Sequence, residues 1–296
     1  MLHRMSMIVA LTATATVAQA QAQDQALQKR GEYLVNTVAA CGNCHTQRGP
    51  DLLADQGKYL AGGNKFDIPP GLAFAKNITS DRDTGIGTWT DAQITVAIRE
   101  GKTKEGNLIG PPMPIDYYNK LSNDDTRAIV AYLRTVKAVR NEVPESKYKI
   151  PLRAEPPAKG EPAPPKTDKV AYGKYLATMA HCAECHTPMA GPKRDYENQF
   201  GAGGFRFEIG GKFVFSRNIT SDRETGIGAW TDDQIKRAIV DGLDKDGNKM
   251  IPQMPYPYFK NLTSEDLDAI VAYVRTIPPV KKAIDKNPSL EAFLQK

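Results

Sequence analysis

The chain has 296 residues, of which 41% are hydrophobic and 25% charged, and its formal net charge is +5 at pH 7. This charge is mild and forms no basic stripe, so the sequence gives no support for nucleic-acid binding. No stretch beyond the N-terminus has the length of a transmembrane helix. We therefore expect a mature chain that is soluble or, at most, peripheral to a membrane.

Residues 1–20 predict a secretory signal peptide. Arg4 supplies the positive start, residues 5–17 are mostly apolar, and Ala18-Gln19-Ala20 fits a small-x-small cleavage site. The apolar run is weak, so an ordinary apolar N-terminus remains the alternative. Export from a bacterial cytoplasm to the periplasm is the expectation.

A helix is expected over residues 25–40, and its counterpart over residues 168–181 is one residue shorter before the cysteine that follows. A glycine and a tyrosine recur in both segments and predict a close crossing with another helix: Gly31 and Tyr33, Gly173 and Tyr175.

Each of these helices leads into a Cys-x-x-Cys-His motif, which is typical of c-type haem attachment. The motifs are Cys41-Gly42-Asn43-Cys44-His45 and Cys182-Ala183-Glu184-Cys185-His186, and they contain all four cysteines of the chain. The thiols would form thioether bonds to the porphyrin, and the histidine would ligate iron. A redox dithiol or half a zinc site is the alternative, but neither needs the trailing histidine. Two covalently bound haem c groups are predicted.

Residues 46–76 and 187–217 are expected to be loops, with a short hairpin formed by residues 205–207 and 213–215. A helix follows Trp89 and a second one follows Trp230, each with a capping-box pair of threonine and glutamine. The capping pairs and the glycines expected to end these helices are Thr90 with Gln93, Thr231 with Gln234, Gly101 and Gly242.

The sixth ligand of each iron decides between a carrier and an enzyme. Besides His3 and the two motif histidines only His181 remains, and it abuts Cys182 on the proximal side, so we expect an exposed or otherwise satisfied residue. Among the methionines, only Met113 and Met254 recur at the same offset, each before a proline. A methionine ligand raises the potential of a His-ligated haem. We predict both as iron ligands, with core filling as the alternative.

Last helices are expected from about residue 122 to 139 and at the equivalent positions of the second half, each with an apolar stripe that packs in the core. Residues 142–167 hold seven prolines and predict a semi-rigid linker along the surface, with a flexible tether as the alternative. Trp89 and Trp230 could pack in the core or bond a haem propionate. Asn77 and Asn218 could bond a propionate or cap a turn.

The chain repeats itself with an offset of 141 residues. Between residues 77–100 and 218–241, 17 of 24 positions are identical. Each copy exceeds 100 residues and holds one motif, so two domains are expected, at 24–141 and 168–296. The fold class predicted for both is all-α.

The segment from Asn77-Ile78-Thr79-Ser80 to Trp89-Thr90-Asp91, set between a haem motif and a Pro-Met-Pro loop, resembles the cytochrome c subunits of bacterial membrane-linked alcohol and sugar dehydrogenases. The resemblance implies a class I cytochrome c fold for each domain, His/Met iron, and electron transfer from a partner dehydrogenase. Such subunits usually carry three haems and a membrane-binding C-terminal segment, whereas this chain has two motifs and a polar end.

These features predict a soluble periplasmic dihaem protein without catalytic residues, which relays electrons from a dehydrogenase to a downstream carrier or oxidase. The alternative is an enzyme, such as a dihaem peroxidase or a thiosulfate-oxidising cytochrome. The near symmetry of the two copies and the lack of a fifth cysteine for a thiolate ligand argue against it.

Overall fold

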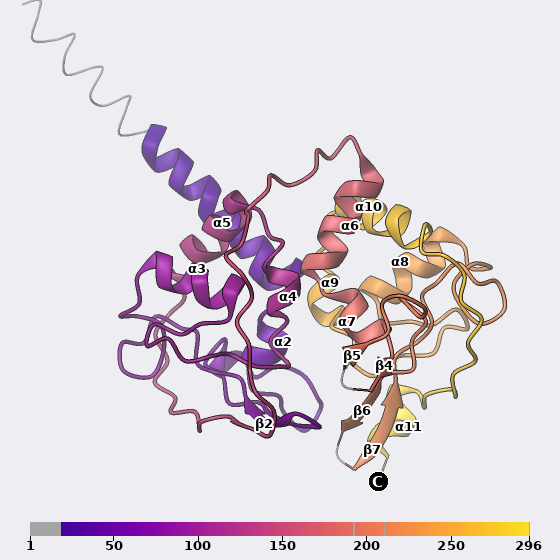
Figure 1. The fold of residues 1–296 in the computed structure, drawn as a ribbon. Coiled ribbons are helices and arrows are strands. Elements are labelled where there is room, and N and C mark those ends of the chain that lie inside the picture. The colour runs from indigo at the N-terminus through magenta and orange to yellow at the C-terminus, as the bar shows by residue number, and fades with distance from the viewer. Residues whose placement is uncertain (1–18, 192, 210, 296) are drawn as a thin grey trace, which may run out of the picture.

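The computed structural model describes residues 19–191, 193–209 and 211–295. The predicted signal peptide therefore lies almost wholly outside the described residues. Within the described ranges, no helix combines the length and the apolar character that crossing a membrane requires. Figure 1 shows the first half (residues 24–141) beside the second half (residues 168–296), with the linker running between them.

In the first half, a helix over residues 19–33 precedes the remaining elements, which are the π-helix η1 (Leu34–Val38), α2 (Gly42–His45), the 3-10 helix η2 (Gln56–Lys58), β1 (Lys65–Ile68), β2 (Gly71–Phe74), α3 (Asp91–Glu100), α4 (Ile115–Tyr118) and α5 (Asn123–Leu133). The linker contributes β3 (Lys147–Tyr148). The second half consists of α6 (Lys169–Met179), α7 (Cys182–His186), β4 (Met189–Ala190), β5 (Lys193–Arg194), β6 (Arg206–Ile209), β7 (Lys212–Phe215), α8 (Asp232–Val240), α9 (Tyr256–Phe259), α10 (Ser264–Val274) and α11 (Leu290–Leu294).

The π-helix η1 accommodates the extra residue of the first half. The chain from Tyr33 to Cys41 is one residue longer than the chain from Tyr175 to Cys182. Ala39 donates its backbone N–H to the Leu34 carbonyl at 2.8 Å, a bond that skips five residues. A single wide turn of this kind absorbs an insertion without ending the helix. Both helices can therefore deliver their haem motif in the same way.

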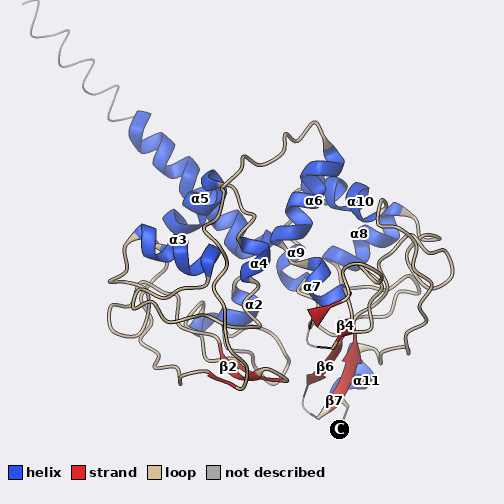
Figure 2. Ribbon diagram, viewed as in Figure 1, coloured by secondary structure: helices blue, strands red, loops and turns tan. Residues whose placement is uncertain are grey.

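The prediction of an all-α fold is wrong, because the structure is 35% helix and 11% strand and contains three small antiparallel sheets. Strand β1 pairs with β2, which also pairs with β3, and β6 pairs with β7. Figure 2 shows these strands gathered at one end of the molecule. The expected hairpin at residues 205–215 is present, but the segment 46–76, expected to be a loop, contains the equivalent β1–β2 hairpin. Strands of only four residues carry too little alternation to be recognised reliably.

The last helices are shorter than predicted, since α5 ends at Leu133 and α10 at Val274. Beyond Leu133, side chains from the Asn77 loop take the carbonyl groups that a continued helix would use. Asn77 Nδ2 donates to the Val139 carbonyl at 2.8 Å, and Ser80 Oγ donates to the Val136 carbonyl at 2.5 Å. The apolar spacing beyond residue 133 therefore reflects tertiary packing rather than helix.

Both predicted capping boxes are confirmed at the N-termini of α3 and α8, with Thr90 and Thr231 as the capping residues. Gly101 ends α3 in the left-handed conformation, with φ at 70°. In the second helix the capping position is Asp241, and Gly242 follows it.

The linker runs along the first half and is bonded to it. Strand β3 pairs with β2, and Glu155 N–H donates to the Glu100 carbonyl at 3.1 Å. Asn119 Nδ2 donates to the Pro156 carbonyl at 2.8 Å. In the second half, Asn287 of the C-terminal segment binds the Phe215 backbone at 2.7 and 2.8 Å. Each half therefore has an extended segment that secures its hairpin.

The buried apolar side chains of the two halves form one connected cluster, from Leu34 in the first half to Ile277 in the second. The expected close helix crossings are present. A Cβ atom added at Gly31 would lie 1.9 Å from the Ala128 carbonyl oxygen, and one at Gly173 would lie 1.8 Å from the Ala269 carbonyl oxygen. Only glycine permits such contact between helix backbones.

Candidate haem-binding sites

Each haem motif forms a short helix in which both thiols and the imidazole lie within five consecutive residues. In the first half, α2 (Gly42–His45) starts directly after Cys41, and His45 N–H donates to the Cys41 carbonyl at 2.9 Å. Residues three and four positions apart share one face of a helix. Cys41, Cys44 and His45 are therefore brought together, and α7 (Cys182–His186) presents the second motif in the same way.

A backbone carbonyl holds each motif histidine. Nδ1 of His45 lies 2.7 Å from the Lys76 carbonyl oxygen, and Nδ1 of His186 lies 2.7 Å from the Arg217 carbonyl oxygen. A carbonyl can only accept, so Nδ1 carries the proton and Nε2 keeps its lone pair for a metal. Lys76 and Arg217 occupy equivalent positions, but sequence analysis missed them because a backbone carbonyl leaves no residue-type signal.

Burial keeps these imidazoles neutral. Desolvation lowers the pKa of His45 and of His186 below 6.5, and the carbonyl bond only partly opposes this. A neutral imidazole is the form that ligates a metal. The electrostatics and the hydrogen bonding therefore favour the same ligand state at both motifs.

All four cysteines are free thiols, including the two in each motif. Burial raises the pKa of Cys41 to about 12, and burial raises the pKa of Cys44 and of Cys182 to about 11. Reactive dithiols have lowered thiol pKa values instead. The donor set thus fits covalent haem attachment better than a redox dithiol.

The residue before each motif has a conformation that is unusual for a non-glycine side chain. Ala40 has φ at 48°, and His181 has φ at 42°. Left-handed backbone at such residues costs free energy and tends to occur at functional sites. Here it gives the chain a sharp turn from the long helix into the motif helix.

His181 lies between the two halves rather than on the opposite side of a haem. Its Nδ1 is 3.0 Å from Glu184 Oε2, an ion-pair distance, although the two atoms are not aligned as a hydrogen bond. Its ring meets the Tyr118 ring edge-on, with 6.3 Å between centroids. These contacts agree with the expectation of a satisfied histidine.

The threonine after each motif secures the end of the motif helix. Thr46 Oγ1 accepts the Leu60 N–H at 3.0 Å, and Thr187 Oγ1 accepts the Gly201 N–H at 3.2 Å. Both threonines are fully buried. Sequence analysis did not single them out, although their recurrence at the repeat offset could have identified them.

Met113 and Met254 lie in tight turns just before α4 and α9. The Met113 carbonyl accepts the Ile115 N–H at 2.9 Å, and the Met254 carbonyl accepts the Tyr256 N–H at 2.8 Å. Both side chains are partly buried against the core. Their ligation of iron stays a prediction.

Asn77 and Asn218 act as turn-capping residues in this structure. Asn77 Oδ1 accepts both the backbone N–H and the hydroxyl of Thr79, at 3.0 and 2.7 Å, and Asn218 repeats the arrangement with Thr220. Both asparagines are buried. Trp89 and Trp230 pack against the core, as one of the two expectations had it.

The two motifs adjoin across the boundary between the halves. Ala40 of the first half packs with Ala180 and Phe259 of the second half. Among smaller contributions, the Glu184 carboxylate raises the pKa of Cys44. The haem-binding segments therefore lie back to back in one structure.

Comparison with known proteins agrees with this site. Residues 170–278 match the family model described as Cytochrome c. The second half therefore contains a cytochrome c domain, which implies a covalently bound haem c.

Over most of its length the chain is also similar to named cytochrome subunits. It is 31% identical over 277 residues to the alcohol dehydrogenase (quinone), cytochrome c subunit, of Gluconobacter oxydans, covering 87% of this chain and 56% of that relative. It is 32% identical over 265 residues to the fructose dehydrogenase cytochrome subunit of Gluconobacter japonicus, covering 84% and 52%. The chain thus spans about half the length of these relatives. A diheme cytochrome c-type protein of Cereibacter sphaeroides is 27% identical over 269 residues, covering 85% of this chain and 86% of that protein.

Proposed function

We propose that the chain is a dihaem electron carrier in which each half is a cytochrome c domain with one covalently bound haem. One observation carries this proposal: both motif histidines donate Nδ1–H to a backbone carbonyl at 2.7 Å from equivalent positions. Two identically prepared ligand sets support two haems of the same kind. The diheme relative, which this chain covers almost completely, supports the same count.

The residues of the chain have distinct roles in this proposal. Cys41, Cys44, Cys182 and Cys185 hold the porphyrins covalently, and His45 and His186 ligate iron through Nε2. Met113 and Met254 are the proposed opposite ligands. The haem supplies a one-electron redox centre when bound, while the protein supplies its position, its ligands and its surroundings.

The partner that supports this assignment best is a dehydrogenase. Two relatives are named as cytochrome subunits of an alcohol and a fructose dehydrogenase. We infer that this chain accepts electrons from a dehydrogenase and passes them to a downstream carrier or oxidase. Export to the periplasm is part of the proposal and rests on the signal-like sequence of residues 1–20.

The test is carbon monoxide binding to the reduced holoprotein, preceded by a haem count from the protein mass. Two haems and an unchanged absorption spectrum after addition of carbon monoxide are expected, because both irons would be closed by strong ligands. A single haem would refute the dihaem proposal. A large spectral change at neutral pH would mean an open iron and would favour a peroxidase or another enzyme.

A further inference from the structure

A tyrosine of the first half enters the last helix of the second half at its N-terminus. Tyr33 donates its hydroxyl to Asp266 Oδ2 at 2.7 Å and accepts the Thr263 N–H at 3.3 Å. Burial, and after it the bond to Asp266, raises the pKa of Tyr33. The phenol therefore stays protonated and remains a donor.

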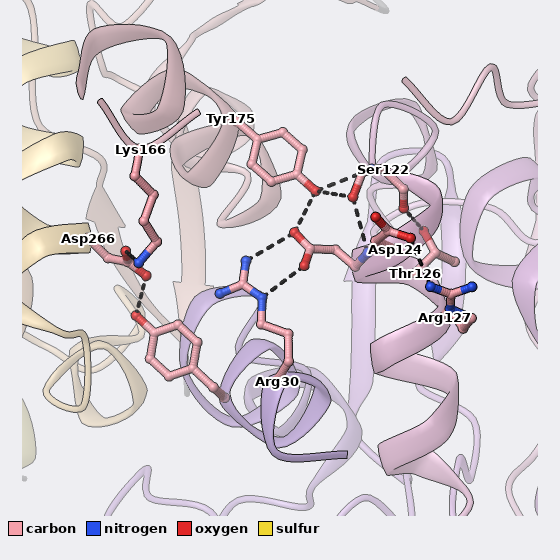
Figure 3. A network of polar contacts seen from close by, with 10 residues as sticks. Arg30, Ser122, Asp124, Thr126, Arg127, Lys166, Tyr175 and Asp266 are labelled. Carbon is pink, nitrogen blue, oxygen red and sulfur yellow. Dashed lines mark hydrogen bonds and ion pairs between the residues drawn. The ribbon is translucent and has the colours of Figure 1, made fainter. Parts of the chain in front are cut away.

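The second half returns the same contact. Tyr175 on α6 donates to Asp125 Oδ2 at 2.8 Å and accepts the Ser122 N–H at 3.2 Å, as Figure 3 shows. Asp125 and Asp266 lie 141 residues apart, and so do Ser122 and Thr263. The two tyrosines thus form a reciprocal, nearly symmetric pair of contacts, each joining one half to the capping turn of the other.

The carboxylates that receive these hydroxyls are buried and depend on their partners. The Asp125 and Asp266 side chains are only 9% and 1% exposed. Arg30 approaches Asp125 at 2.8 Å, and Lys166 approaches Asp266 at 3.6 Å. Leaving a buried polar group without its partner costs about 1–3 kcal/mol. Each tyrosine hydroxyl is therefore held at a defined point.

Rigid structure connects the tyrosine contacts to the haem motifs. Tyr33 and Tyr175 lie on the helices that lead directly into Cys41 and Cys182. Glycine contacts hold these helices against α5 and α10, and the cluster of Ala40, Ala180 and Phe259 joins the two helix ends. Little freedom is left for one motif to move relative to the other.

We propose that Tyr33 and Tyr175 are positioning residues that fix the two haem-binding motifs in one arrangement, so that electrons pass from haem to haem inside the chain. This inference rests on the proposed dihaem function. In the step concerned, one electron leaves the ferrous iron of one haem and reduces the ferric iron of the other, and no bond or proton is exchanged.

The test compares the holoprotein with the double variant Tyr33→Phe/Tyr175→Phe. Pulsed electron paramagnetic resonance of the oxidised protein measures the distribution of distances between the two irons. A narrow distribution is expected for the parent protein and a broad one for the double variant. Electron exchange between the haems after partial flash reduction should also become several-fold slower.

Tyr132→Phe is the matched control, because the Tyr132 hydroxyl accepts from Asn36 within the first half, at 3.0 Å. It should leave both measurements unchanged. If the double variant fails to bind both haems, the single variants Tyr33→Phe and Tyr175→Phe replace it. An unchanged iron–iron distribution or an unchanged exchange rate, in a variant with both haems attached, would overturn the inference and leave the dihaem function standing. A parent protein with one haem would refute the function itself.

Discussion

The ring of Tyr258 lies against Gly42, the residue that follows the first cysteine of the first haem motif. A Cβ atom at Gly42 would lie 2.9 Å from both Cε1 and the hydroxyl oxygen of Tyr258. Tyr258 belongs to α9 of the second half, so a residue of one half directly covers the haem motif of the other. The equivalent position in the second motif is Ala183, which shows that the motif itself tolerates a methyl group.

Gly42→Ala is expected to displace Tyr258 and to destabilise the protein by about 1–3 kcal/mol, the usual cost of overpacking a buried site. The free energy of unfolding in denaturant would measure this. Ala183→Gly is the matched control, and we expect it to change stability by less, since it only removes a methyl group from a helical position. Equal effects of the two changes would contradict the proposed contact.

Gly31→Ala and Gly173→Ala should destabilise the protein more strongly than Gly42→Ala. Their added Cβ atoms would approach carbonyl oxygens at 1.9 and 1.8 Å, and a backbone cannot rotate away as a side chain can. We expect a loss of at least ~3 kcal/mol, at the upper end of overpacking effects, seen as a lowered midpoint of thermal unfolding. Gly57→Ala is the control, because its Cβ would meet only the Asp55 side chain, at 3.2 Å. A midpoint like that of the control would show that the helices can separate without cost.

The sequence made some of these relationships predictable and hid others. The glycine–tyrosine pairs indicated a helix crossing, and the capping boxes marked the starts of α3 and α8, because these signals are local. The extra residue before Cys41 was visible as a difference in length, but its π-helix was not. A wide turn has no residue signature of its own, and only the need to present both motifs alike explains it.

Features that depend on distant segments could not be predicted. The β1–β2 hairpin consists of four-residue strands, and the linker strand β3 completes its sheet. The early end of α5 results from Asn77 and Ser80, which lie more than 50 residues away. The contact of Tyr33 with Asp266 spans 233 residues and both halves. Periodicity reports none of these.

Met113→Ala should open one iron of the holoprotein, because it removes the proposed sulfur ligand without touching the haem motif. Carbon monoxide would then bind to about half of the reduced haem. The midpoint potential of that haem should fall, since methionine ligation raises it and axial ligands adjust potentials over about 0.8 V. Met254→Ala should do the same to the other haem.

Met189→Ala is the control for both methionine variants, because Met189 is largely exposed and has no methionine at the equivalent position. It should leave carbon monoxide binding and both potentials unchanged. If Met113→Ala behaves like this control, Met113 is a packing residue and another group closes the first iron.

Asp81→Asn should flatten the acid dependence of stability. The backbone N–H and the hydroxyl of Thr84, each 2.7 Å from Asp81 Oδ1, lower the pKa of this carboxyl below its ordinary 3.8. Because the folded-state pKa is the lower one, the stabilisation is fully present above pH 3.8 and is lost as the pH falls through the lowered value. The variant should therefore be less stable at neutral pH and lose less stability between about pH 4 and pH 2, as measured by denaturant unfolding at each pH. Asp222→Asn should act in the same way, because Asp222 repeats these bonds in the second half. Asp67→Asn, at an exposed strand position, is the control, and an acid slope in Asp81→Asn as steep as in that control would disprove the assignment.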